Sequence, residues 1–256
     1  MFKKNPNLST KILSIETSGR NFSLTLSEGN IKLSQLSHLG ELSFNIGYRH
    51  SSILKESCQF LLKKAGWKID ELTHIAISTG PGSFTGLRVG ISFTRALASA
   101  LHIPLIGVPT FELIAKRFEH YKNSPLTVLI DSIGEDLFVG TFKAGKITPS
   151  QPYKVVKLTE LLKKVPNQNH LYVGEGFLRY EKEICRKNRD GALFVEQIGL
   201  RPYFSRTCPN SHTPRSKELA EIAFQKIKTQ PFSKNEWKKV VPFYLRLPLV
   251  VERLKK

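Results

Sequence analysis

The sequence predicts a duplicated α/β fold, and three observations lead to this prediction. Strand-like and helix-like segments alternate along the chain. A strand, an acidic turn and a second strand occur twice, over 12–26 and 126–142. A short strand that runs into a Gly-x-Gly turn also occurs twice, over 72–82 and 171–176. Two copies of such a unit, each with crossover helices, indicate two lobes, which we assign to residues 1–108 and 109–256.

The first hairpin and the helix after it show the clearest periodicities. Phe22, Leu24 and Leu26 alternate with polar residues, which is the period of a half-buried strand. The helix has its apolar residues on one face, and Gly66 is expected to end it. In chain order, the predicted elements of this region are a hairpin over 12–26, a helix over 51–65, a strand over 72–79, a helix over 87–101, a strand over 104–109 and a helix over 110–121.

The rest of the chain repeats part of this pattern and adds a terminal helix. The hairpin over 126–142 and the strand over 171–173 match the earlier units. A loop is predicted over 204–213, after which Ser216 is expected to cap a helix over 217–228. The tail over 240–246 is apolar enough to pack on the body of the protein.

Composition indicates a soluble globular protein. Apolar residues make up 40% and charged residues 23% of the 256 residues. No apolar run approaches the roughly 20 residues that span a bilayer, and the N-terminus lacks the pattern of a signal peptide. We therefore expect a cytoplasmic protein without a membrane segment. The three cysteines form no C-x-x-C pair, which excludes a disulfide framework and favours reduced thiols.

The net charge of +18 is the most unusual bulk property. Basic residues are concentrated late in the chain, in 186–189, 201–228 and 253–256. Such a field attracts phosphate-rich partners, although a lysine-rich surface is also compatible with simple solvation. No recognised nucleic-acid motif is present, so nucleic-acid proximity is favoured over sequence-specific binding.

The sharpest local signal is the glycine loop, residues 80–86, between a predicted strand and a predicted helix. Glycine-rich turns at this place can wrap an anion with backbone N–H groups. Five residues separate Gly80 from Gly86, however, and Leu87-Arg88 follows, which excludes a Walker loop. The dinucleotide fingerprint fails because Thr85 stands where its third glycine belongs. The alternative is that the glycines allow a sharp turn and close helix packing.

The helix after the glycine loop carries a small-residue ridge that recurs every four residues, formed by Gly86, Gly90, Thr94 and Ala98. Most other positions of this helix are apolar, so it must be buried on nearly all sides. Either the protein's own core surrounds it, or the ridge meets a helix of a partner chain.

The sequence contains no complete catalytic set. None of the seven histidines lies three or four residues from another, so no helical two-histidine metal site is present. Ser83 fails the nucleophile-elbow pattern because Thr85 replaces the following glycine. Glu16 and Asp131 are candidates for a two-carboxylate metal pair, but local hydrogen bonding in acidic turns is the favoured interpretation. We therefore expect no catalytic and no metal-binding residues.

The glycine loop and its helix resemble the signature of the TsaB/YeaZ family. The segments that carry the resemblance are 80–90 above all, and also 12–18, 49–51, 129–131 and 242–246. The resemblance implies two ribonuclease-H-like lobes of the actin/Hsp70-like ATPase superfamily. This chain differs from the family at Glu16, where an aspartate is usual.

The resemblance also implies a function as the non-catalytic subunit of the complex that makes threonylcarbamoyladenosine in tRNA. The expected partners are a TsaD-type catalytic subunit, a TsaE-type ATPase and, through the complex, tRNA; the isolated chain is a monomer or a homodimer. No tightly bound cofactor is expected, with ATP or ADP a candidate only at the complex interface. The implied partner interface comprises Ser51, Leu54, Cys58, Gly82, Ser83, Phe84, Gly86, Leu87, Arg88, Gly90, Thr94 and Ala98. The alternative functions are a small-molecule kinase of the same superfamily and a metallopeptidase, and the histidine spacing argues against the latter.

Overall fold

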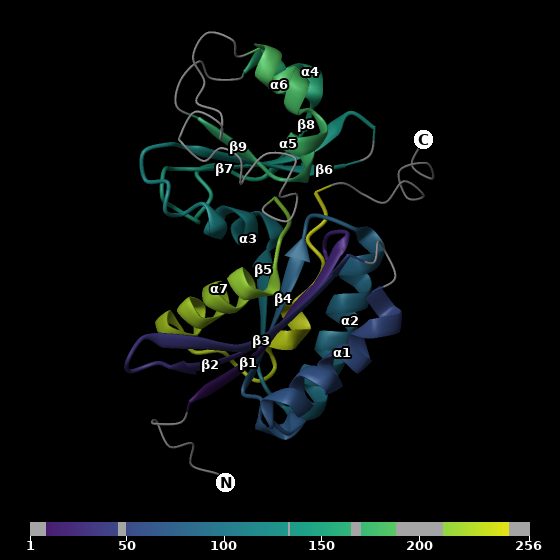
Figure 1. Cartoon of the computed structure of the whole chain (residues 1–256), viewed down its shortest axis with the longest axis vertical. Helices are drawn as coiled ribbons and strands as arrows, with labels where there is room; N and C mark the ends of the chain where they lie inside the picture. The colour runs from purple at the N-terminus through teal and green to yellow at the C-terminus, as the bar shows by residue number, and fades with distance from the viewer. Residues whose placement is uncertain (1–8, 46–49, 133, 165–169, 188–211, 246–256) are drawn as a thin grey trace. The chain divides into compact units, whose positions relative to one another are not determined.

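The computed structural model describes residues 9–45, 50–132, 134–164, 170–187 and 212–245 (Figure 1). The chain divides into two compact units, residues 1–110 with 214–243 and residues 111–213 with 244–256. The boundary predicted at residue 108 lies beside this division. Assigning all of 109–256 to the second lobe is wrong, however, because 214–243 returns to the first unit.

The first unit is built on a five-stranded mixed sheet in the order β3-β2-β1-β4-β5. Its strands are β1 (Thr10–Glu16), β2 (Asn21–Asn30), β3 (Gln35–Asn45), β4 (His74–Gly80) and β5 (Leu105–Pro109). β1, β2 and β3 form an antiparallel meander, whereas β4 runs parallel to β1 and β5 runs parallel to β4.

Helices cover both faces of this sheet (Figure 1). α1 (His50–Ala65) and α2 (Phe84–Leu101) pack on one face, and α7 (Ser216–Thr229) packs on the other. The short 3-10 helix η1 (Ile69–Glu71) precedes β4, and η3 (Glu236–Lys239) contacts α2 and β5. The main-chain N–H of Phe243 donates to the carbonyl of Thr79 at 2.7 Å, so the tail packs on the body as expected.

The second unit repeats the first four strands of this order. Its sheet runs β8-β7-β6-β9, with β6 antiparallel to β7, β7 antiparallel to β8 and β6 parallel to β9. The strands are β6 (Leu126–Asp131), β7 (Asp136–Phe142), β8 (Lys154–Lys157) and β9 (Leu171–Val173). The helices are α3 (Thr110–Arg117), α4 (Leu158–Lys163), α5 (Glu175–Arg179) and α6 (Glu181–Lys187). The shared order confirms the predicted duplication.

Two local predictions about polar residues are wrong, and α7 explains both. β2 was expected to be half-buried, yet Ser23 and Thr25 are as deeply buried as the apolar residues between them. Ser216 does not cap α7: Arg215 holds the cap position, and the Ser216 hydroxyl lies 2.7 Å from that of Thr25. The Ser216 N–H also donates to the Ser23 hydroxyl at 2.9 Å. α7 therefore covers the second face of β2. The buried hydroxyl groups on that face form hydrogen bonds with Ser216, which offsets the free-energy cost of removing them from water.

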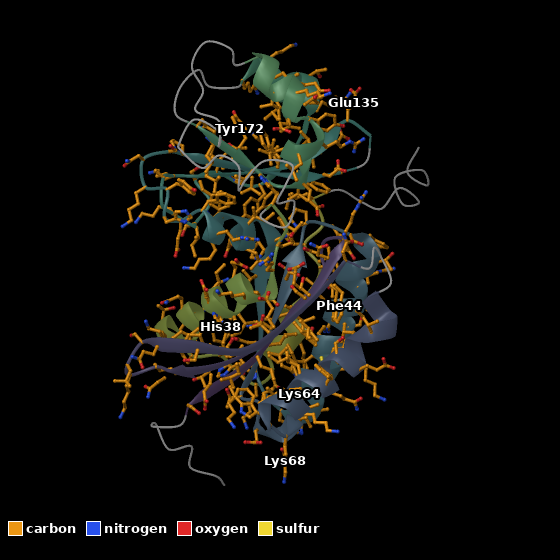
Figure 2. The ribbon with its side chains drawn as sticks, in the orientation of Figure 1. His38, Phe44, Lys64, Lys68, Glu135 and Tyr172 are labelled. Carbon is orange, nitrogen blue, oxygen red and sulfur yellow. The ribbon has the colours of Figure 1, made fainter. Side chains whose placement is uncertain are left out.

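The remaining elements differ from prediction mainly at their ends. α2 begins three residues earlier than expected because the Ser83 side chain accepts a hydrogen bond from the Gly86 N–H. Gly66 ends α1 with φ +69°, as predicted. The loop predicted over 204–213 lies mostly outside the described residues. β3 forms one edge of the first sheet, with Phe44 and His38 along it (Figure 2).

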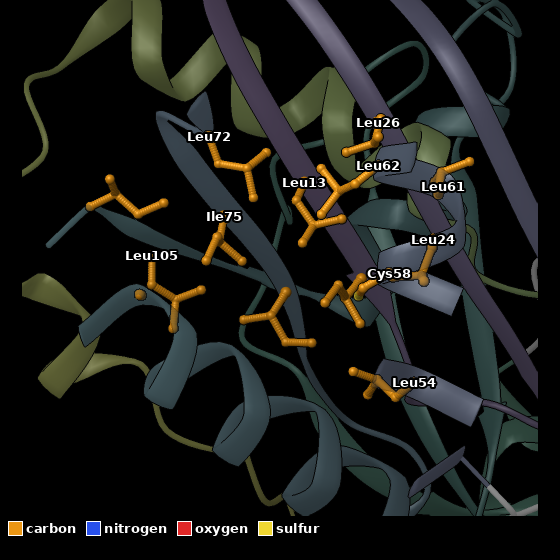
Figure 3. Close-up of a cluster of buried hydrophobic side chains, with 14 of the residues drawn as sticks. Leu13, Leu24, Leu26, Leu54, Cys58, Leu61, Leu62, Leu72, Ile75 and Leu105 are labelled. Atoms are coloured by element: carbon orange, nitrogen blue, oxygen red, sulfur yellow. The ribbon is translucent and has the colours of Figure 1, made fainter. Parts of the chain in front are cut away.

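The core of the first unit joins the apolar sides of β1, β2 and β4 to α1 (Figure 3). Its largest contributors from the strands include Leu13, Leu24 and Ile75, which are fully buried. Leu54 and Cys58 enter the same cluster from α1. Burial of each large side chain contributes roughly 1.5–3 kcal/mol, so this shared cluster fixes α1 on the sheet.

We predict that the Cys58 thiol is almost inert while the protein is folded. Burial raises its pKa to about 12 from 9.0, and the thiolate is the reactive form. A Cys185→Ser/Cys208→Ser variant should therefore react with Ellman's reagent much more slowly at pH 8 in buffer than in urea. Because the folded pKa lies above the unfolded one, stability should also fall as the pH rises from about 9 towards 12. Reaction of the folded chain at the rate of a free thiol would contradict the burial.

Candidate functional site

The N–H groups of the glycine loop form hydrogen bonds within this chain. The Ser83 N–H donates to the Ser18 carbonyl oxygen at 2.6 Å. The Ser83 hydroxyl accepts a hydrogen bond from the Gly86 N–H at 3.2 Å, and the Ser83 carbonyl oxygen accepts one from the Leu87 N–H at 2.9 Å. Three donors that a phosphate-binding loop would direct at a ligand thus have partners in the protein.

Close approach explains the glycines of this loop. Gly80 has φ +109°, a conformation that favours glycine. A Cβ on Gly82 would lie 2.3 Å from the Ser18 carbonyl oxygen, which no side chain tolerates. The structure therefore supports the tight-turn interpretation of the glycine loop and not the anion-binding one.

The small-residue ridge of α2 packs against the chain's own sheet. A Cβ on Gly90 would lie 2.2 Å from Thr17 Oγ1 and 3.1 Å from Ile77 Cδ1. Thr94 and Ala98 have no exposed surface, and Thr94 Oγ1 donates to the Gly90 carbonyl at 2.9 Å. The prediction that this ridge meets a partner helix is therefore wrong, and the alternative, packing in the chain's own core, is correct.

The predicted interface residues differ in their exposure. Leu54, Cys58, Gly86, Leu87, Gly90, Thr94 and Ala98 are buried within this chain and cannot be reached by a partner. Phe84 and Arg88 are exposed, and the Arg88 guanidinium lies 4.5 Å from the Phe84 ring centroid. Gly82 and Ser83 are partly exposed, and Ser51 lies in α1 with its side chain outside the described residues.

Other apolar residues of α1 and α2 that keep exposed surface were missing from the predicted interface. Phe60 on α1 is 51% exposed, and half-buried residues extend this apolar area. We define the α1–α2 surface as Ile53, Phe60, Val89, Phe93, Ala96 and Leu97. The signal that reveals it is helical phase: Ile53 and Phe60 lie seven residues apart, off the face that carries the buried leucines of α1.

The two acidic turns are occupied by local partners. Glu16 is fully buried, and its Oε1 accepts hydrogen bonds of 2.5 Å from both the N–H and the hydroxyl of Ser18. In the second unit, Asp131 accepts from the Arg179 guanidinium at 2.7 Å, and this hydrogen bond raises the pKa of Arg179. Both observations support local hydrogen bonding over a metal-binding carboxylate pair.

The described residues contain neither a metal-binding cluster nor a membrane-spanning helix. No three histidine, cysteine or acidic side chains in this part of the chain gather as metal ligands would. Within the same residues, every helix is too short or too polar to cross a bilayer.

Comparison with known proteins identifies the family. A family model described as TsaD, tRNA N6-adenosine threonylcarbamoyltransferase, matches residues 46–239. The tRNA threonylcarbamoyladenosine biosynthesis protein TsaB of Bacillus subtilis (strain 168) is 23% identical over 238 residues, 92% of this chain and 94% of its own length. The chain belongs to the TsaB/YeaZ branch of this family.

A further relative and two solved structures are also similar to this chain. TsaB of Buchnera aphidicola subsp. Schizaphis graminum is 27% identical over 150 residues, covering 56% of this chain and 70% of that protein. YeaZ of Pseudomonas aeruginosa superposes with a TM-score of 0.66 at 18% identity, covering 92% of this chain and all of YeaZ. A second Pseudomonas aeruginosa structure, described as similar to peptidase YEAZ, gives a TM-score of 0.69 at 19% identity, over 93% of this chain and all of that one. The predicted α/β fold is thus confirmed.

We predict that Gly90→Ala lowers the free energy of unfolding by about 1–3 kcal/mol, because the new methyl group overlaps Thr17. Urea titration measures the effect, and Ser92→Ala, at an exposed position of the same helix, should change stability by no more than about 0.5 kcal/mol. A Thr17→Ala/Gly90→Ala double variant should recover part of the loss. Equal stability of Gly90→Ala and Ser92→Ala would show that the ridge is not packed as described.

Proposed function

We propose that this chain serves in tRNA threonylcarbamoyladenosine biosynthesis as a non-catalytic subunit. In this role it binds and activates a TsaD-type threonylcarbamoyltransferase. The observation that carries the proposal is the relationship to a TsaB-named protein over nearly the whole of both chains. A transferase of Clostridioides difficile matches over only 34% of this chain and 27% of its own, although at 40% identity. Full-length kinship therefore lies with the TsaB proteins.

The site geometry supports a non-catalytic role. The two carboxylates that are candidates for a metal pair have local hydrogen-bond partners. In the glycine loop, the Ser83 N–H donates to Ser18, and the Gly86 and Leu87 N–H groups donate to Ser83. A catalytic centre needs groups that are available to a substrate. Here the hydrogen bonds of these groups stabilise the fold instead.

The α1–α2 surface is the proposed docking site for the catalytic subunit. It presents aromatic and aliphatic side chains from two adjacent helices, and its base is fixed by the core beneath it. Apolar groups displayed on a rigid support are typical of an interface centre. Without the catalytic subunit, the same surface is free to pair two copies of this chain.

The remaining expectations extend this proposal. A TsaE-type ATPase joins the assembly, tRNA is reached through the complex, and ATP or ADP is held at the subunit interface and not tightly by this chain alone. The second candidate function is a small-molecule kinase. The hydrogen bonds that close the glycine loop argue against it, and calorimetric titration of the isolated chain with ATP discriminates the two. Tight ATP binding with phosphoryl transfer would favour the kinase.

We predict that a Phe60→Glu/Ala96→Glu variant loses its complex with the TsaD homologue of the same organism. Both positions are exposed on the outer sides of α1 and α2, so the variant should fold normally while placing two charges in an apolar interface. Co-purification with a tagged TsaD homologue measures complex formation, and circular dichroism checks the fold.

The matched control is Val155→Glu, a similar change at an exposed position of β8 in the second unit. It should co-purify like the wild type. Unchanged binding by the Phe60→Glu/Ala96→Glu variant would move the docking site elsewhere. Failure of the wild type to bind under any nucleotide condition would overturn the proposed function.

A further inference from the structure

Basic and aromatic side chains gather where η3 packs beside α2. The Arg95 guanidinium lies 5.8 Å from the Trp237 ring centroid, and Lys238 Nζ lies 5.5 Å from the same ring. Lys234, Lys238 and Lys239 are exposed, whereas Arg95 and Trp237 are half-buried. We define the η3 surface as these five residues. Their arrangement comes from the tertiary structure, because α2 and η3 are more than a hundred residues apart in sequence.

The positive charge of the η3 surface is poorly compensated. Glu236 is the one acidic residue between Lys226 and Lys239, and the sequence of α2 has no acidic residue. Among the described residues, no ion pair is made by Lys234, Lys238 or Lys239. Like charges held close together without counter-charges favour the binding of an anion.

A neighbouring lysine of α7 extends the surface towards β5. Lys226 Nζ lies 3.5 Å from the Gly107 carbonyl oxygen. A Cβ built on Gly107 would lie 3.3 Å from a methyl carbon of Val240, the residue after η3. Lys226 therefore stands near the end of η3, which makes the positive area longer than one point contact.

The chemistry of this surface matches a nucleic-acid backbone. Lysine ammonium groups make point contacts with phosphates, and an indole ring provides a face on which a base can stack. Trp237 packs on the core of the first unit and keeps part of its surface exposed beside these lysines. We propose that the η3 surface binds the sugar–phosphate backbone of tRNA. The choice of tRNA over other RNA rests on the proposed function.

The first test measures tRNA affinity and its salt dependence. A Lys234→Gln/Lys238→Gln/Lys239→Gln variant of the full chain is titrated against fluorescently labelled tRNA transcript at several salt concentrations. We expect a loss of about tenfold or more in affinity, and a slope of log K against log salt that is smaller by about 2–3. The control, Lys154→Gln/Lys157→Gln/Lys163→Gln, removes three exposed lysines of the second unit and should change both values much less. Equal losses in the two variants would show a diffuse charge effect and overturn the proposal.

The second test places the RNA at Trp237. The chain has two tryptophans, so a Trp67→Phe variant leaves Trp237 as the only indole fluorophore. Its emission should change on addition of tRNA, with a midpoint equal to that of the affinity titration. Heparin at equal charge should compete with tRNA for the η3 surface. Because heparin has no bases to stack on the indole ring, it should not reproduce the change in Trp237 emission. No change at saturating tRNA would exclude contact at η3.

The outcomes separate this inference from the proposed function. Loss of tRNA affinity in the glutamine variant, with normal co-purification of the TsaD homologue, supports both. Normal co-purification with unchanged tRNA affinity overturns the η3 surface alone. A chain that binds tRNA through η3 but forms no complex with the TsaD homologue keeps the surface and overturns the proposed subunit role.

Discussion

The close approach of α2 to the central strands is the constraint on which the first unit depends. Thr17, just after β1, fills the space that a side chain at Gly90 would need, and Ser18 does the same at Gly82. These contacts hold α2 and the loop before it so close to the sheet that no side chain fits between them. Any larger residue at either glycine must push α2 outwards, and the dense packing of a protein interior resists that shift. The position of every outward-facing residue of α2 follows from this contact.

The same contact determines where the N–H groups of the glycine loop donate their hydrogen bonds. Its N–H groups end on Ser18 and Ser83, and the buried Glu16 is held by the same Ser18. In other proteins a glycine-rich turn at this place binds phosphate, whereas here it connects the end of β1 to the start of α2 through a hydrogen bond. These hydrogen bonds make the loop rigid, and the proposed docking surface on α1 and α2 rests on the same rigid support.

α7 makes the first unit discontinuous in sequence. It arrives from residue 216 and covers the face of β2 that carries Ser23 and Thr25, which pair with Ser216. His38 of β3 also faces Glu221 of α7, with 3.6 Å between Nε2 and Oε1. Without this helix, a row of hydroxyl-bearing residues would remain unpaired on an open sheet. The segment that follows α7 then delivers η3 to α2, so one return of the chain both completes the fold and assembles the basic surface.

Sequence alone determined the element types, the duplication and the family. Alternation along β2, the helical face of α1 and the spacing of the glycine loop are local patterns, and each is set by residues near one another in the chain. It also suggested the local role of Glu16 and Asp131. Only the tertiary structure decided that the small-residue ridge faces the chain's own sheet, because periodicity shows that a face is buried but not what covers it. The burial of Ser23 and Thr25, the return of 214–243 to the first unit and the meeting of Arg95 with Trp237 have the same cause. Each depends on contacts between residues distant in sequence, and no local pattern encodes which distant segment supplies the partner.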